Sequence, residues 1–80
     1  MHIVYVLISE KYPDRSYVGY TTNLDQRIDD HNIGGSSYTK KYGPWSLTTY
    51  TVFEKKSKAM EFERYLKSGS GFAFLKRRLI

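Results

Sequence analysis

The chain has 80 residues, no cysteine and a formal net charge of +5 at pH 7. This length allows one small domain over residues 1–80, whose core must form without disulfides or a cysteine-ligated zinc site. No apolar run approaches the ~20 residues of a membrane span, and Met1-His2-Ile3-Val4 lacks the basic region of a signal peptide. We therefore expect a cytoplasmic protein with no membrane partner. The positive charge, with eight Tyr, four Phe and one Trp, favours a polyanionic partner such as nucleic acid.

Two strands are predicted over residues 2–9 and 16–21, because both runs are short and rich in β-branched and aromatic residues. The first is apolar on both faces and is expected to be central. The turn-rich segment 11–15 predicts a hairpin, in which Ser9 lies opposite Tyr17 and Tyr5 lies opposite Thr21. One face then carries Tyr5, Leu7, Tyr17, Gly19 and Thr21. The other face carries Val4, Val6, Ile8, Val18 and Tyr20.

A helix is predicted from its N-cap Asn23, with Gln26 in the capping-box position, to about Asn32. Gly34-Gly35 ends it. At about 100° per residue, Arg27 and His31 project from the inward side of this helix. The carboxylates of Asp25, Asp29 and Asp30 point away. Residues 33–44, rich in Gly, Ser, Tyr and Lys, are predicted to form a loop.

Residues 45–53 predict a third strand, in which Trp45, Leu47 and Thr49 alternate with polar neighbours. A helix capped by Ser57 follows, to about Ser68, with Ala59, Phe62 and Leu66 as its core stripe. A short helix after Ser70-Gly71 is expected to turn Phe72, Leu75 and Leu79 inwards and Lys76, Arg77 and Arg78 outwards. The order β-β-α-β-α-α predicts an α+β domain, with a small three-stranded antiparallel sheet flanked by helices.

Several side chains are candidates for chemistry, each with a structural alternative. Tyr5 and Tyr17 either pack in a small core or form a phenol pair beside Gly19, which leaves room for a ligand. Arg27 is either a surface cation or a donor to phosphate, and His31 is either a core-edge histidine or part of the same site.

Glu63 borders the apolar stripe of its helix, whereas Glu61 lies opposite the stripe. A carboxylate in that place is costly unless it is paired or bound to a metal. It either forms an ion pair with Lys67 one turn later, or holds a hard divalent cation whose other ligands are water and substrate phosphate. Lys40, Lys41 and Lys67, with the rings of Tyr38 and Tyr42, are typical of a surface that follows a nucleic-acid backbone.

Val4-Tyr5-Val6, Tyr17-Val18-Gly19 and the run Gly19-Tyr20-Thr21-Thr22-Asn23-Leu24 followed by Arg27 resemble the motifs of the GIY-YIG nuclease superfamily. His31-Asn32, Thr39 and the helix around Glu63 are similar to its small stand-alone bacterial, excision-nuclease-like members. The resemblance covers essentially the whole chain. It implies metal-dependent hydrolysis of a phosphodiester, with DNA repair as one setting.

Carried over residue by residue, the resemblance makes Tyr17 the general base or its partner, and Tyr5 the group that orients the water or Tyr17. Arg27 would stabilise charge on the phosphate, and His31 would assist proton transfer or hold the phosphate. Glu63 would bind Mg²⁺ or Mn²⁺. The expected nucleic-acid contacts are Gly19, Thr21, Tyr38, Lys40, Lys41 and Lys67.

Two positions depart from the family pattern. Val4 and Val6 replace the glycine and isoleucine of the first triplet, which a strand tolerates. Leu75 stands where many members carry an asparagine. We expect an endonuclease that cuts DNA, including branched or single-stranded DNA, with little intrinsic sequence preference. We expect no small-molecule cofactor, and a protein partner would direct the enzyme to its target. The alternatives are a non-catalytic nucleic-acid-binding module on the same fold and a protein-interaction domain.

Overall fold

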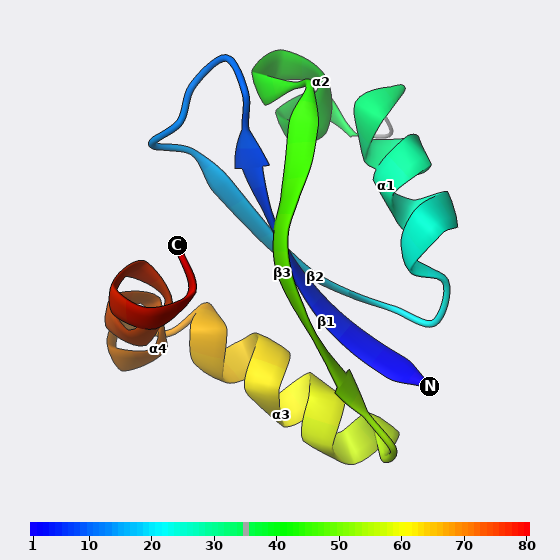
Figure 1. Cartoon of the computed structure of the whole chain (residues 1–80), viewed down its shortest axis with the longest axis vertical. Helices are drawn as coiled ribbons and strands as arrows, with labels where there is room; N and C mark the ends of the chain where they lie inside the picture. Colours follow the sequence, from blue (N-terminus) through cyan, green and yellow to red (C-terminus); the bar gives the residue numbers. More distant parts are fainter. Residues whose placement is uncertain (35) are drawn as a thin grey trace.

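The computed structural model describes residues 1–34 and 36–80. Three antiparallel strands form one sheet in the order β2-β1-β3, so the most apolar strand is central as predicted. Figure 1 shows α1 and α2 beside one end and side of this sheet, and α3 and α4 beside the other. The elements are β1 (His2–Ser9), β2 (Ser16–Thr21), α1 (Leu24–Asn32), α2 (Ser37–Tyr42), β3 (Trp45–Phe53), α3 (Lys56–Leu66), α4 (Gly69–Phe74) and the π-helical turn η1 (Leu75–Leu79).

The hairpin register differs from the prediction by two residues. Gly19 lies opposite Tyr5 and Tyr17 lies opposite Leu7, whereas the prediction placed Thr21 opposite Tyr5 and Ser9 opposite Tyr17. The turn is shorter than expected, because the Ser9 amide donates to the Arg15 carbonyl (3.0 Å) and leaves residues 10–14 in the turn, whereas pairing of Ser9 with Tyr17 would leave residues 10–16 there. A shift by two residues leaves every side chain on its predicted face, so the two tyrosines still share one side of the sheet.

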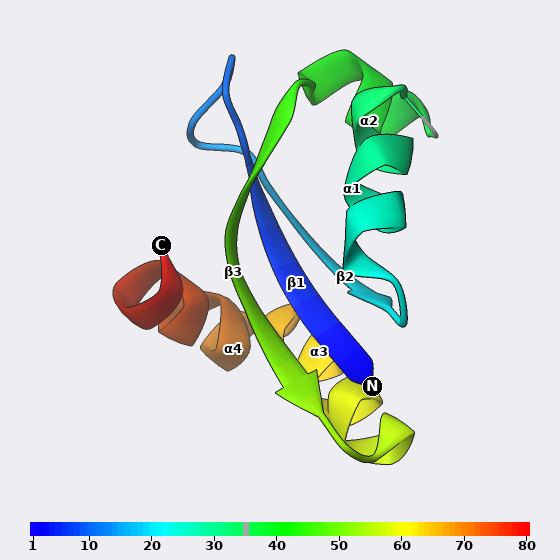
Figure 2. The same ribbon diagram turned by 45° about the vertical axis from the view of Figure 1, so that its right-hand side comes forward.

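Each face of the sheet supports its own core. Val4, Val6 and Val18 pack against α3 and η1 through Ala59, Leu66 and Leu75. On the opposite face, Tyr5, Leu7 and Trp45 form a second buried cluster, with Tyr17, Leu24, Ile28 and Tyr42 packed against it. Figure 2 shows the sheet lying between α1 and α2 on one side and α3 and α4 on the other. The α+β architecture is therefore confirmed.

The predicted loop at 33–44 is wrong, since residues 37–42 form α2. Ser36 and Thr39 make a complete capping box, in which each side chain bonds the backbone amide of the other. By contrast, the box predicted for α1 is half formed: Asn23 accepts from the Gln26 amide (3.2 Å), but the Gln26 side chain donates to Asp30 (3.1 Å). Gly35, which was predicted to end α1 together with Gly34, lies outside the described residues.

Three details of the C-terminal half also differ from the prediction. Helix α3 begins at Lys56 after Lys55, so Ser57 lies inside the helix, and Ser68 caps α4 rather than ending α3. Helix α4 begins at Gly69, and Phe72 is 49% exposed instead of buried. A register shift between Val6 and Leu7, opposite residues 47–49 of β3, leaves Leu47 exposed.

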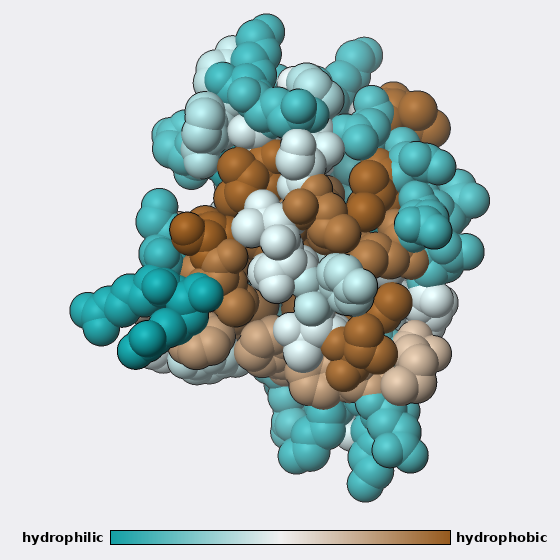
Figure 3. Space-filling model, in the orientation of Figure 1, coloured by the Kyte–Doolittle hydropathy of each residue, from teal (hydrophilic) through white to brown (hydrophobic). Residues whose placement is uncertain are grey.

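The face shown in Figure 3 carries apolar side chains over the middle of the molecule and hydrophilic ones towards its margins. Exposed apolar residues of β3 include Leu47, Tyr50 and Val52. Among the described residues, no helix has the length and apolar character needed to cross a membrane.

Candidate active site

A buried hydrogen bond joins β1 to α1. The Oη atom of Tyr5 lies 2.7 Å from Nε2 of His31, and both side chains are buried, at 0% and 7% exposed. Tyr5 comes from the central strand, whose position is fixed by pairing on both sides. His31 comes from the last turn of α1, where the inward side predicted from helical spacing is confirmed. The two residues therefore form a rigid pair at the boundary between sheet and helix.

Gly19 makes room for this pair. It lies opposite Tyr5 on β2, and a Cβ atom there would be 2.5 Å from Cζ of Tyr5 and 3.0 Å from Cε1 of Tyr17. Real Cβ atoms are not found so close to a ring carbon. The glycine thus lets the Tyr5 ring cross β2 towards its open edge. We find no room for a ligand directly above Gly19, because the Tyr5 phenol occupies that space.

A hollow of about 360 Å³ opens above the Tyr5–His31 pair. Tyr17, Arg27 and His31 line it together, as the sequence predicted. The Tyr17 and His31 ring centres are 4.5 Å apart. Within residues 1–34 and 36–80, the Tyr17 hydroxyl has no hydrogen-bond partner in the protein. Tyr17 is only half-buried, so its phenol is available to a ligand in the hollow.

Burial and charge set the protonation of the buried pair. Burial is the main cause that raises the pKa of Tyr5 to about 12, and Tyr17 and Glu63 add to the rise while the positive charge of Arg27 opposes it. Burial also lowers the pKa of His31 below its ordinary value of 6.5; Arg27 lowers it further and Asp30 acts against the change. At pH 7 the site therefore contains a protonated phenol and a neutral imidazole.

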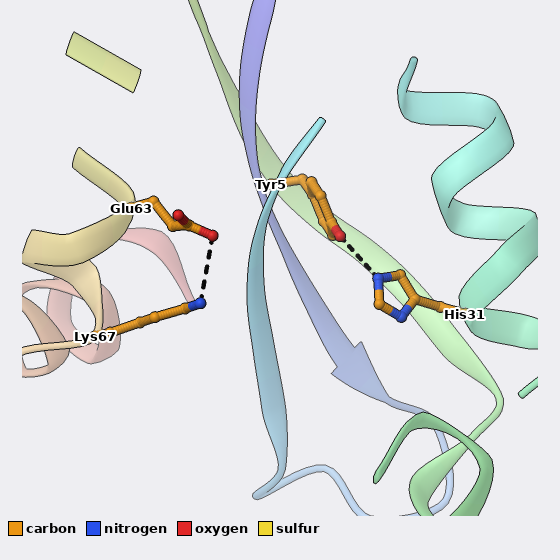
Figure 4. A network of polar contacts seen from close by, with 4 residues as sticks. All are labelled: Tyr5, His31, Glu63 and Lys67. Atoms are coloured by element: carbon orange, nitrogen blue, oxygen red, sulfur yellow. Dashed lines mark hydrogen bonds and ion pairs between the residues drawn. The ribbon is translucent and has the colours of Figure 1, made fainter. Parts of the chain in front are cut away.

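Glu63 reaches the site from the opposite face of the sheet. Its carboxylate lies 3.3 Å from the Lys67 ammonium, in the ion pair that helical spacing predicted. Figure 4 shows this pair on one side of β2 and the Tyr5–His31 pair on the other. The two pairs do not share one hollow, but Glu63 is close enough for its charge to raise the pKa of Tyr5. The groups are thus arranged around the open edge of β2.

The donor set at Glu63 suits a hydrated hard cation. Its side chain is 18% exposed, and its partner Lys67 is exposed enough to swing away. Among the described residues, no group of three His, Cys, Asp or Glu side chains gathers to enclose a metal. Magnesium keeps several waters and commonly uses one or two carboxylates together with substrate phosphate. A single, mostly buried carboxylate fits that pattern, since it leaves the other positions around the cation to water and substrate phosphate.

The predicted nucleic-acid contacts fall into two groups. Tyr38, Lys40 and Lys41 lie on α2, and Lys67 follows α3; all four are exposed to solvent. Thr21, however, is buried, and its hydroxyl both accepts from the Asn23 amide (3.0 Å) and donates to the Asn23 carbonyl (3.1 Å). Thr21 therefore shapes the turn that starts α1. Together with Gly19, it is a residue that supports the site.

Some residues around the site were not anticipated. Asp30, predicted to point away, lines the hollow with His31, because it sits at the end of the helix where the chain turns inward. Asn32 accepts from the Trp45 amide at 2.7 Å and so fastens the end of α1 to β3. Thr39 is buried and borders the hollow, and its carbonyl accepts from the Trp45 indole (3.0 Å). The Ser36-x-x-Thr39 capping pattern was the available signal for this last contact.

Leu75 occupies the position at which the family pattern has an asparagine. It is fully buried and packs in the core between the sheet and α3. In this chain the position therefore contributes to the core, and the phosphate contact implied by an asparagine has no equivalent there.

Comparison with known proteins agrees with the motifs and the geometry. The model of the GIY-YIG catalytic domain matches residues 1–76. A UPF0213 protein of Clostridium perfringens is 44% identical over 69 residues, which make up 84% of this chain and 71% of that protein. A UPF0213 protein of Haloquadratum walsbyi is 37% identical over 65 residues, covering 80% of this chain and 73% of that protein.

A solved structure extends the likeness to the fold. The solution NMR structure of a UPF0213 protein from Bacillus halodurans is 36% identical in sequence and superposes with a TM-score of 0.56. The match covers 94% of this chain and 81% of the other.

Proposed function

The chain belongs to the GIY-YIG catalytic-domain family, a nuclease superfamily, and from this premise we propose that it is a metal-dependent endonuclease acting on DNA with little intrinsic sequence preference. The observation that carries the proposal is the hollow in which Tyr17, Arg27 and His31 converge above the buried Tyr5. A phenol that can order water, a planar cationic donor to phosphate and a neutral imidazole base are groups that phosphodiester hydrolysis uses in one place.

The exposure of each group assigns its role. Tyr5 is fully buried, so it cannot touch a substrate, and it acts by holding the His31 ring through the 2.7 Å hydrogen bond. Tyr17 and Arg27 line the hollow and would contact the phosphate or the attacking water. The proposal therefore makes Tyr17 the reacting phenol and Tyr5 the positioning one.

We assign the proton transfer to Tyr17 and His31 together. As water attacks phosphorus and the bond to the leaving oxygen breaks, the proton lost by the water has to move to a base. His31 is neutral at pH 7 because its pKa is lowered, so it can accept that proton from water ordered by the Tyr17 hydroxyl. Arg27 then offers two N–H donors to the phosphate oxygens, whose negative charge grows during the attack.

Glu63 is the residue that would hold Mg²⁺ or Mn²⁺. When bound, such a cation neutralises charge on the phosphate and on the leaving oxygen. Lys67 forms an ion pair with the Glu63 carboxylate. When a cation binds to Glu63, the Lys67 side chain would turn towards the nucleic-acid backbone. The positive charge of Lys67 then remains beside the substrate.

A cleavage assay on defined substrates tests the proposal. Single-stranded, nicked and branched DNA are incubated with the purified chain in Mg²⁺, in Mn²⁺ or with a chelator. Glu63→Gln is expected to remove cleavage, whereas Glu61→Gln on the same helix, which loses only an exposed ion pair with Lys58, is expected to keep it. Cleavage that survives the chelator and Glu63→Gln would contradict the proposal. Salt-sensitive DNA binding without any product would favour the non-catalytic binding module instead.

A further inference from the structure

A second hollow lies on the other side of the Tyr17 ring. It has a volume of about 340 Å³ and follows residues 16–18 along the open edge of β2. Tyr17 lines both this hollow and the one above His31, so the two are neighbours separated by a single phenol. A ligand that fills the first hollow can therefore extend into the second.

The second hollow, called the slot below, has a lining whose chemistry suits a flat ring. Leu66 and Leu75 form an apolar floor, and the rings of Tyr38 and Phe72 stand on either side, on α2 and α4. The Tyr38 ring is held in place, because its hydroxyl donates to the Ser16 carbonyl (3.1 Å) and its face stacks on Trp45. Phe72 remains 49% exposed although it borders an apolar floor.

Cations surround the slot. Lys67 lines it, and the Lys76 ammonium lies 5.7 Å from the centre of the Phe72 ring. An apolar slot with aromatic walls and a cationic rim suits an aromatic ring that carries a negative charge close by. A nucleobase attached to its phosphate has this combination, whereas an apolar side chain of a protein partner would make no favourable contact with either ammonium group.

We propose that this slot receives an unstacked nucleobase adjacent to the phosphodiester bound between Tyr17 and His31. The inference rests on the proposed function, and it narrows the substrate to DNA in which a base is free to leave the stack. Single strands, flaps and distorted junctions present such a base, while an intact duplex must first be unstacked. Lys67 joins the two hollows, since it pairs with Glu63 and also lines the slot.

Binding experiments test the slot without requiring turnover. The affinity for a short single-stranded oligonucleotide is measured by fluorescence anisotropy in chelator, for the native chain, Phe72→Ala and Phe74→Ala. Phe74 is the matched control, because it is an exposed phenylalanine on the same helix that does not line the slot. We expect binding to weaken about tenfold for Phe72→Ala, the loss typical of one base–aromatic stack, and less than twofold for Phe74→Ala. Thermal melting by circular dichroism checks that both variants remain folded.

A scan with abasic sites completes the test. Removing one base at a time should weaken binding of the native chain about tenfold at one position, and should have no further effect on Phe72→Ala at that position. Equal effects of the two phenylalanine variants, or an abasic scan without any sensitive position, would overturn the slot. So would a Phe72→Ala variant that changes self-association in sedimentation but leaves DNA affinity unchanged.

The two proposals fail in different ways. If the protein cuts DNA but its affinity does not depend on the position of the abasic site, the proposed function is supported and the nucleobase slot is contradicted. If base binding depends on Phe72 but no product forms with Mg²⁺ or Mn²⁺, the nucleobase slot is supported and the proposed hydrolytic function is contradicted.

Discussion

The ring of Tyr5 covers Gly19 on the neighbouring strand so closely that a Cβ atom at position 19 would lie 2.5 Å from Cζ of the tyrosine. The hydroxyl of the same tyrosine is hydrogen-bonded to His31 at 2.7 Å. Because Gly19 allows the Tyr5 ring to take this place, it also determines the position of the His31 imidazole. A residue without any functional group thus positions the base of the proposed reaction.

Gly19→Ala should therefore displace the Tyr5 phenol and misplace His31. Overpacking of this kind costs about 1–3 kcal/mol of stability, and a shift of about 1 Å in a catalytic group can lower the rate about 100-fold. The measurements are urea denaturation and single-turnover cleavage. Gly69→Ala is the control, because a Cβ atom there would have no neighbour within 4 Å. Equal cleavage by both variants would show that the close approach at Gly19 has no role in the site.

Tyr17→Phe removes the one phenol that both lines the hollow and is free of a protein hydrogen bond within the described part of the chain. We expect cleavage to fall by about 10²–10⁴-fold, the range of general acid–base contributions, with little change in DNA affinity because the ring remains. Tyr50→Phe on β3 is the control, since its ring is exposed and lines neither hollow. A Tyr17→Phe variant with native rates would exclude the hydroxyl from the reaction.

His31 should make both activity and stability dependent on pH below 7. Its folded-state pKa is lowered from 6.5, so the unfolded chain takes up the proton first as pH falls, and stability declines from about pH 6.5 downwards until the folded pKa is passed. Cleavage should decline over the same acid range, because protonated His31 cannot accept a proton.

The pH dependence is checked by urea midpoints and cleavage rates at intervals of pH. His31→Gln should flatten the acid decline in stability, whereas His2→Gln, the other histidine of the chain, should leave the decline attributed to His31 in place. Identical profiles for the two variants would contradict the assignment. Tyr5 should add no change in stability until pH approaches 10, its ordinary pKa; because burial raises its folded pKa to about 12, the unfolded chain loses the proton first above pH 10 and stability should then decline.

The capping box of α2 should contribute measurably to the free energy of unfolding. Ser36→Ala removes a side chain that accepts from the Thr39 amide, and the loss of an N-cap costs about 1 kcal/mol, or about 4–8 °C in melting temperature for a domain of this size. Ser37→Ala, one residue later and exposed, is the control. Equal melting temperatures for the two variants would show that α2 does not depend on its cap.

Much of the fold could be predicted because the relevant signals are local. Short runs rich in β-branched and aromatic residues identified the first two strands, and alternation identified the third. The stripe of Ala59, Phe62 and Leu66 identified α3. The hairpin register could not be predicted to the residue, since nothing local decides whether Ser9 lies opposite Tyr17 or opposite Arg15. Helix α2 was missed because glycine and serine outweighed the Ser36–Thr39 capping pattern that starts it.

The candidate site was predictable in its members and less so in its layout. Helical spacing placed Arg27 and His31 on one side, and strand alternation placed Tyr5 beside Tyr17. Burial separated the two phenols into different roles, and burial depends on tertiary packing that spacing does not describe. The position of Glu63 across β2 likewise depends on how α3 packs on the far face of the sheet.

The proposed nuclease activity requires that groups from both faces of the sheet meet around the edge of β2 at one metal-dependent site. The most direct test is to titrate Mn²⁺ into the isotopically labelled chain and follow its NMR signals. Paramagnetic broadening should centre on Glu63 and extend to Tyr5, Tyr17 and Arg27; it should vanish in Glu63→Gln and persist in Glu61→Gln. Broadening centred elsewhere, or confined to the α3 side of the sheet, would contradict the claim.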